Sequence, residues 1–217
     1  MTRPALAFLL LATIAFTLAG CGGSTSPDVP KDVAPAATPA TGAAPWPAPP
    51  NPLQLTRDAG LVPEPEEHLE YHVHAHLDVF VNGKPVQVPA GIGINIHDPA
   101  VHHVKLSDGT DAYGGIAPPC DQPCISPLHT HDVTGILHTE SATAKPNTLG
   151  EFFTEWGVKL DHKCVGGYCE PGTSVLIYVD GHRYTGDPDA IELTNHREIA
   201  IVIGTPPAKV PSSFNFG

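Results

Sequence analysis

The chain has 217 residues, enough for one or two domains, and glycine (21) and proline (25) together make up about a fifth of it. Only 16% of the residues are charged and 6% are aromatic, which favours loops and short strands over long surface helices. Asp and Glu (23) outnumber Lys and Arg (11), so the net charge is −12. This acidity argues against a nucleic-acid partner, because no excess of cations is available to replace phosphate counterions. The 13 histidines are the most informative feature.

The N-terminal segment 1–20 has the pattern of a signal peptide. Arg3 supplies the positive start, and the apolar run that follows from Ala5 to Leu18 is too short for a mature transmembrane helix. The sequence Leu18-Ala19-Gly20-Cys21 resembles a bacterial lipobox. That resemblance implies cleavage before Cys21, lipidation of its side chain and export to the periplasmic or cell-surface face of the envelope. The alternative is an ordinary signal peptide with an incidental cysteine.

Composition divides the exported part into three segments. Residues 21–67, rich in Pro and Ala, are expected to form a disordered tether in which Trp46 is exposed. Residues 68–204 are expected to form the histidine-rich folded domain, and residues 205–217 a short polar tail.

The first expected strand alternates strictly between two kinds of side chain. From His72 to Val81, apolar residues occupy one face, and His72, His74, His76 and Asp78 occupy the other. Asn82-Gly83 then predicts a type I′ hairpin turn. A two-residue loop would pair Val81 with Lys84, Val79 with Val86 and Leu77 with Val88.

Three further elements complete the predicted fold. A second hairpin is expected from Val175 to Tyr184, turning at Asp180-Gly181, and 198–204 reads as a strand buried on both faces. A short helix is expected after Thr148, capped by Thr148 and Glu151 and stopped by Gly157. We therefore predict an α+β fold, a small antiparallel-sheet domain with one short helix, β-grasp-like; a β-sandwich is the alternative.

A second histidine cluster lies between the two hairpins, where His129-Thr130-His131-Asp132 precedes His138-Thr139-Glu140. On a strand, residues two apart point to the same side, so each pair can offer two imidazoles or an imidazole and a carboxylate to one ion. The favoured ligands are His74, His76, His129 and His131, followed by His72 and His138; Asp78, Asp132 and Glu140 could bind the metal or orient the imidazoles. Surface or structural roles are the alternative for each histidine taken singly.

The types of side chain available as ligands limit which metals the protein could bind. The only methionine is Met1, which the expected cleavage removes, so copper sites built on methionine are excluded. Histidine with carboxylate favours Zn or Cu(II), with Ni or Fe possible.

The predicted domain contains four cysteines, Cys120, Cys124, Cys164 and Cys169. Outside the cytoplasm they are expected to form disulfides, and four cysteines allow three pairings, among which we favour the local pairs 120–124 and 164–169. Two alternatives stay open: a four-thiolate zinc site in a reducing compartment, and Cys124 as a thiolate ligand beside His129.

Several stretches together resemble a family of secreted or membrane-anchored bacterial proteins that has no established activity. The similar segments are His72–Lys84, Val88–Gly93, Cys124–His138, Thr148–Gly157 and Tyr184–Pro188. They span nearly the whole predicted domain, and the resemblance implies a cysteine at the place of Cys124 but not reliably the other three.

The sequence thus predicts a membrane-anchored extracytoplasmic lipoprotein that captures, buffers or delivers a transition metal. Its predicted partners are the membrane, through the N-terminal lipid, and possibly an envelope protein. One alternative is a metal-dependent enzyme, although the chain lacks the Gly-x-Ser-x-Gly, His-Glu-x-x-His and Walker motifs. Another is an envelope adaptor without metal, whose histidines act in packing or pH sensing.

Overall fold

The computed structural model describes residues 38–216. The predicted signal peptide and the lipidated Cys21 lie outside the described residues. Within residues 38–216, no helix has both the length and the apolar character that crossing a bilayer requires.

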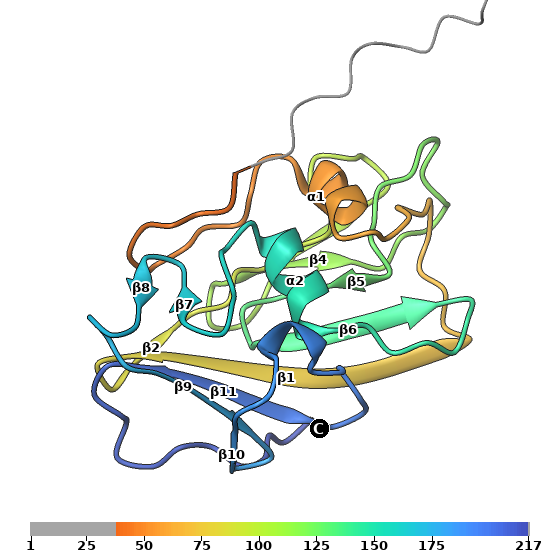
Figure 1. Cartoon of the computed structure of the whole chain (residues 1–217). Helices are drawn as coiled ribbons and strands as arrows, with labels where there is room; N and C mark the ends of the chain where they lie inside the picture. Colours follow the sequence, from red (N-terminus) through yellow and green to blue (C-terminus); the bar gives the residue numbers. More distant parts are fainter. Residues whose placement is uncertain (1–37, 217) are drawn as a thin grey trace, which may run out of the picture. The chain divides into compact units, whose positions relative to one another are not determined.

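One open, seven-stranded mixed sheet forms the centre of the fold, with the order β10-β9-β11-β1-β6-β5 and with β2 also pairing with β1 (Figure 1). Its strands are β1 (Tyr71–Val81), β2 (Lys84–Val86), β5 (Leu128–His129), β6 (Ile136–Ser141), β9 (Val175–Val179), β10 (His182–Tyr184) and β11 (Glu198–Ile203). The pair β1–β11 is parallel and the other pairs are antiparallel, so the prediction of a purely antiparallel sheet is wrong. The N-terminal half of β1 pairs with β6 and its C-terminal end with β2.

The remaining elements are smaller. They are the ribbons β3 (His102–Lys105) with β4 (Asp111–Gly114) and β7 (Cys164–Val165) with β8 (Tyr168–Cys169), the helices α1 (Pro52–Asp58) and α2 (Leu149–Trp156), and the 3-10 turn η1 (Pro188–Ala190). The fold is therefore a sheet-rich mixture of α and β, as predicted, with two α-helices among the described residues where one was expected. The β-grasp-like grouping stays a prediction.

The first hairpin has the predicted register at two of its three pairs. Val79 pairs with Val86 and Val81 with Lys84, and Asn82 and Gly83 both adopt positive φ, as a type I′ turn requires. Strand β2 ends at Val86, so the third expected pair, Leu77 with Val88, is not part of the ladder.

Helix α2 lies against the apolar face of the sheet (Figure 1). Its capping box is present as predicted: the Thr148 side chain accepts from Glu151 N, and the Glu151 carboxylate accepts from Thr148 N. Gly157, in the left-handed region, ends the helix. Phe152, Phe153 and Trp156 are buried against the apolar side chains of β1 and β11. The polar face of β1, which carries the histidines, is therefore the opposite face of the sheet.

The prediction of a disordered tether is wrong for the described part of 21–67. Trp46 is only 3% exposed, its ring makes an edge contact with Trp156, and its carbonyl accepts a hydrogen bond from Trp156 Nε1. Helix α1 follows and buries Leu55. The Pro-rich composition conceals two large apolar side chains that fill the core, so the folded body begins before residue 68 and Trp46 is not an exposed linker residue.

The described part of the predicted tail, 205–216, folds back over the histidine face of the sheet. The Phe214 ring stacks on His76 with centroids 3.8 Å apart, and the Phe216 ring stacks on His196 at 4.5 Å. The folded body thus extends beyond the predicted range 68–204 at both ends.

Candidate metal centre

Strand pairing places histidines from three strands in one row. His74 on β1 lies directly opposite His138 on β6, and His138 lies opposite His129 on β5. Two residues along the ladder, on the same face, His72 lies opposite Glu140. Partners in register project from the same face, so the two clusters of the sequence meet on the face opposite the apolar core.

His129 and His131 direct their Nε2 atoms toward one another, 3.3 Å apart. His129 Nδ1 lies 2.8 Å from the Ser126 carbonyl and His131 Nδ1 lies 2.6 Å from the Tyr113 carbonyl. A carbonyl only accepts, so each Nδ1 carries the proton and each Nε2 presents a bare lone pair when its ring is neutral. Two nitrogens bound to one tetrahedral zinc ion at ~2.0–2.1 Å would lie about 3.3 Å apart. The observed separation therefore suits a shared ion.

Glu140 and His138 complete a set of four ligand groups. The ligand atoms of His129, His131, His138 and Glu140 all lie within 4.8 Å of one another. Glu140 Oε1 lies 3.4 Å from His138 Nδ1 and 3.8 Å from His131 Nε2, and Oε2 lies 3.9 Å from His129 Nε2. Three imidazoles thus surround one carboxylate whose side chain is 4% exposed.

Two buried atoms of this set have no hydrogen-bond partner among the described residues: His138 Nδ1 and Glu140 Oε2. Leaving a buried polar atom unpaired costs about 1–3 kcal/mol, and more for a charged group. Coordination of a cation would satisfy both atoms at once, which makes them independent support for an ion at this position.

The protonation states also favour a cation. Burial, together with the charge of His131, holds the pKa of His129 well below its usual value, so this ring is neutral. Burial alone would raise the pKa of Glu140, but the close approach of the His131 and His138 imidazoles outweighs it and lowers the pKa, so the carboxylate stays charged. Burial likewise opposes charging of His131, but Glu140 and the Tyr113 carbonyl raise its pKa. A buried negative charge among imidazoles is compensated when a divalent cation binds beside it.

The outer part of the cluster is formed by His72 and His74. Their Nε2 atoms lie 2.8 Å apart, and the ligand atoms of His72, His74 and His138 again lie within 4.8 Å of one another. Burial and the neighbouring imidazoles His138 and His72 lower the pKa of His74 to about 4, so this ring is neutral. His72 is the most exposed of these histidines, and its Nε2 lies 3.2 Å from Glu140 Oε1.

His76, although two residues from His74 on the same face, does not join these histidines. Its Nδ1 lies 2.9 Å from Glu198 Oε2 and its Nε2 lies 2.9 Å from the Thr134 carbonyl. A proton occupies each contact, so neither nitrogen of His76 has a lone pair free for a metal. Asp78 lies with His76 and Glu198 in a separate group, 3.9 Å from His76 Nδ1. An ion bound by this separate group would have to displace a proton of His76, and the expectation that His76 is a ligand stays a prediction.

Asp132 belongs to none of the candidate metal groups among residues 38–216. Its Oδ1 accepts a hydrogen bond from Thr134 N at 2.8 Å, and it therefore shapes the turn that follows His131.

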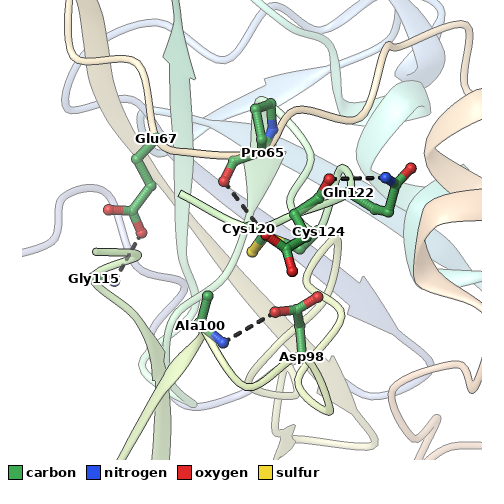
Figure 2. Close-up of a disulfide and its surroundings, with 9 residues drawn as sticks. Pro65, Glu67, Asp98, Ala100, Gly115, Cys120, Gln122 and Cys124 are labelled. Atoms are coloured by element: carbon green, nitrogen blue, oxygen red, sulfur yellow. Dashed lines mark hydrogen bonds between the residues drawn. A yellow bond between two sulfur atoms is a disulfide. The ribbon is translucent and has the colours of Figure 1, made fainter. Parts of the chain in front are cut away.

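The cysteines form the two local pairs favoured from the sequence, Cys120–Cys124 and Cys164–Cys169. Figure 2 shows the first pair beside Pro65, whose carbonyl accepts from Cys120 N at 2.8 Å. Cys124 has no thiolate to offer, so the alternatives of a four-thiolate zinc site and of Cys124 as a ligand are both wrong. Two disulfides indicate an oxidising, extracytoplasmic environment.

Several residues that hold the centre escaped the sequence analysis. Ser126 and Tyr113 orient His129 and His131 through backbone carbonyls, which no side-chain pattern reveals. At Gly114 a Cβ would overlap the His131 ring at Nδ1, so only glycine lets strand β4 approach that ring closely. The pair Gly114-Gly115 is the one sequence signal that could have pointed to this contact.

Comparisons with known proteins do not identify the site, so its assignment depends on the geometry of the residues described above. No protein-family model, curated protein or solved structure matches the chain. The resemblance to a family of secreted histidine-rich proteins therefore stays a prediction.

Proposed function

We propose that this protein binds a divalent transition metal at His129, His131, His138 and Glu140 and serves to capture, buffer or deliver that metal. The observation that carries the proposal is the convergence of these four ligand groups within 4.8 Å of one another. The backbone carbonyls that fix the Nδ1 protons of His129 and His131 support it, because metal-binding histidines generally donate their second N–H to such a group.

Zn or Cu(II) is the metal that we propose first, with Ni or Fe next. The donors are imidazole nitrogens and a carboxylate oxygen, which suit these ions. Sulfur donors are absent from the site, because the four cysteines of the described residues are paired in disulfides.

We further propose that the protein is an exported lipoprotein, anchored to the cell envelope through Cys21. The lipobox-like sequence before Cys21 supports the anchor, and the two disulfides support an oxidising compartment. The net charge of −12 would raise the local concentration of cations, which suits metal capture, and an envelope protein is the proposed recipient. A Cys21→Ser variant tests the anchor: it should move from the detergent phase to the aqueous phase.

Metal content, measured by plasma mass spectrometry on protein purified without chelators, tests the binding function. The double variant His129→Ala/His131→Ala should lose the metal of the unsubstituted protein. The matched control His162→Ala/His182→Ala removes two exposed histidines that belong to no candidate metal group among residues 38–216, and it should retain the metal. Equal metal content in all three proteins would refute the site, and metal-free unsubstituted protein that also takes up none on titration would refute the function.

A further inference from the structure

The six histidine and glutamate side chains of the cluster separate into two groups. One group contains His129, His131, His138 and Glu140, and the other contains His72, His74 and His138. Within each group the ligand atoms lie within 4.8 Å of one another, and His138 alone belongs to both. The six side chains do not form one such group, so as placed they offer two neighbouring sets of candidate ligands that share His138.

We propose that His72, His74 and His138 form a second, solvent-facing position for a divalent transition metal beside the buried one. This inference rests on the proposed function, because both positions share His138 and use the same class of ion. When both positions are filled, His138 bridges them as an imidazolate with one ring nitrogen on each ion, and its N–H proton is released to solvent.

The outer pair lies within reach of one ion, although its Nε2 atoms are closer than the roughly 3.3 Å expected for two nitrogens on a tetrahedral zinc ion and would have to separate slightly. His72 Nε2 and His74 Nε2 lie 2.8 Å apart, with their ring planes at 81°. The two rings come from alternate residues of one strand, so the backbone of β1 holds them together without a loop. The His74 and His138 rings lie 4.4 Å apart across the strand pair β1–β6, which brings the third imidazole to the same place.

Glu140 lies between the two positions. Its Oε1 is 3.2 Å from His72 Nε2, on the outer side, and its Oε2 is 3.9 Å from His129 Nε2, on the inner side. A carboxylate in that place offers an oxygen to either ion and offsets the repulsion between two cations. Two neighbouring positions are therefore electrostatically compatible.

The two positions differ in their access to solvent. The His129 side chain is fully buried, whereas that of His72 is 36% exposed. The outer position also has fewer protein ligands, three imidazoles against three imidazoles and a carboxylate. We therefore expect it to bind more weakly and to exchange its ion faster than the buried position.

The number of Zn²⁺ ions bound per chain tests the second position. The purified protein, stripped of metal, is titrated with Zn²⁺ in isothermal calorimetry, and bound metal is measured after desalting. The unsubstituted protein should take up two equivalents in two affinity classes, and a dilute chelator should remove the weaker one first. The variant His72→Gln/His74→Gln should retain one equivalent with the tighter affinity, and His162→Gln/His182→Gln should behave as the unsubstituted protein.

Two results would overturn the second position while leaving the proposed function intact. One is uptake of a single equivalent that His72→Gln/His74→Gln leaves unchanged. The other is uptake of a single equivalent that is lost both in this variant and in His129→Ala/His131→Ala, which would indicate one shared site. Absence of any Zn²⁺ binding would instead refute the proposed function itself. Circular dichroism of each variant establishes whether the fold is retained; we expect retention for His72→Gln/His74→Gln, whereas the fully buried His129 makes His129→Ala/His131→Ala the more disruptive variant.

Discussion

His76 Nδ1 and Glu198 Oε2 lie 2.9 Å apart in a pair that is almost wholly buried. The second ring nitrogen of His76 contacts the Thr134 carbonyl, and the Phe214 ring covers one face of the imidazole. The third histidine of the motif His72-Val73-His74-Ala75-His76 thus joins β1 to β11 and to the C-terminal segment. Its neighbours His72 and His74 face the candidate metal centre instead.

His76→Gln should leave metal content unchanged and lower stability. The substitution leaves the Glu198 carboxylate buried without its partner, which costs roughly 3 kcal/mol of unfolding free energy. Urea unfolding and plasma mass spectrometry measure the two quantities. A variant that folds normally but loses its metal would contradict the structural role.

The stabilisation that the His76–Glu198 pair provides should decrease as the pH rises. Burial opposes charging of His76, but the hydrogen bond and charge of Glu198 outweigh it and raise the pKa. The stabilisation is therefore complete below the unfolded value of about 6.5 and is lost as the pH rises through the folded-state pKa. The stability difference between the unsubstituted protein and His76→Gln should shrink as the pH rises from 6 to 9, and a constant difference would contradict this assignment.

Local patterns predicted the elements that depend on local physics. The alternation of β1, the Asn82-Gly83 turn and the capping box of Thr148 and Glu151 all recur in the structure. Each is decided by residues within a few positions of one another, where periodicity and capping chemistry are sufficient.

Long-range contacts explain what the sequence could not predict. Strand periodicity puts His74 and His76 on one face, but only the parallel pairing with β11 brings Glu198 to His76. The Pro-rich composition around Trp46 suggests disorder, whereas contact with Trp156, more than a hundred residues away, orders it. The residues adjacent to His76 and to Trp46 in the sequence do not indicate either contact.

Glu140→Gln should weaken metal binding by at least the roughly 10- to 100-fold that is typical for loss of a residue that only orients the ligands, without changing the fold. The amide keeps the shape of the side chain, but it removes the negative charge that faces four histidines. Competition titration with a chromophoric chelator measures the affinity. Glu170→Gln, at an exposed position, is the control and should bind as the unsubstituted protein does. Equal affinities in both variants would remove Glu140 from the centre.

Metal affinity should rise with pH across the neutral range. Glu140 and the Tyr113 carbonyl raise the pKa of His131 above its usual value, in spite of burial, so this ring carries a proton that an ion must displace. Each proton displaced lowers the affinity about tenfold per pH unit below that pKa. Titrations at pH 6, 7 and 8 measure the slope, and calorimetry in buffers of different ionisation enthalpy counts the protons released. A pH-independent affinity would indicate that His131 is not a ligand.

Removing the disulfide near the centre should reduce stability but not metal binding. Cys120→Ser/Cys124→Ser opens a short loop, for which the chain-entropy relation gives about 2 kcal/mol of lost unfolding free energy. Cys124 is buried among apolar side chains that include Ile94 and Ile125, and it belongs to no candidate metal group among residues 38–216, so metal content should remain that of the unsubstituted protein. Loss of metal in a variant that folds would restore the interpretation of Cys124 as a ligand.

Glu155→Gln should stabilise the protein at alkaline pH. This α2 side chain is 0% exposed, and the hydroxyl groups of Thr56 and Ser126 near it only partly offset the effect of burial on its pKa. Burial raises its pKa from 4.5 to about 8. Between these values the folded state keeps a proton that the unfolded state releases, so stability falls by up to about 1.4 kcal/mol per pH unit.

The glutamine variant has no proton to lose at this position, so its stability curve should lack that decline. Urea unfolding of both proteins should give similar free energies near pH 4.5 and a clear advantage for Glu155→Gln at pH 8 to 9. Glu151→Gln is unsuitable as a control because it would remove the capping box, whereas the exposed Glu170→Gln changes the same charge without touching the core. If Glu155→Gln and Glu170→Gln showed the same pH dependence, burial of an uncharged carboxyl group under α2 would be ruled out.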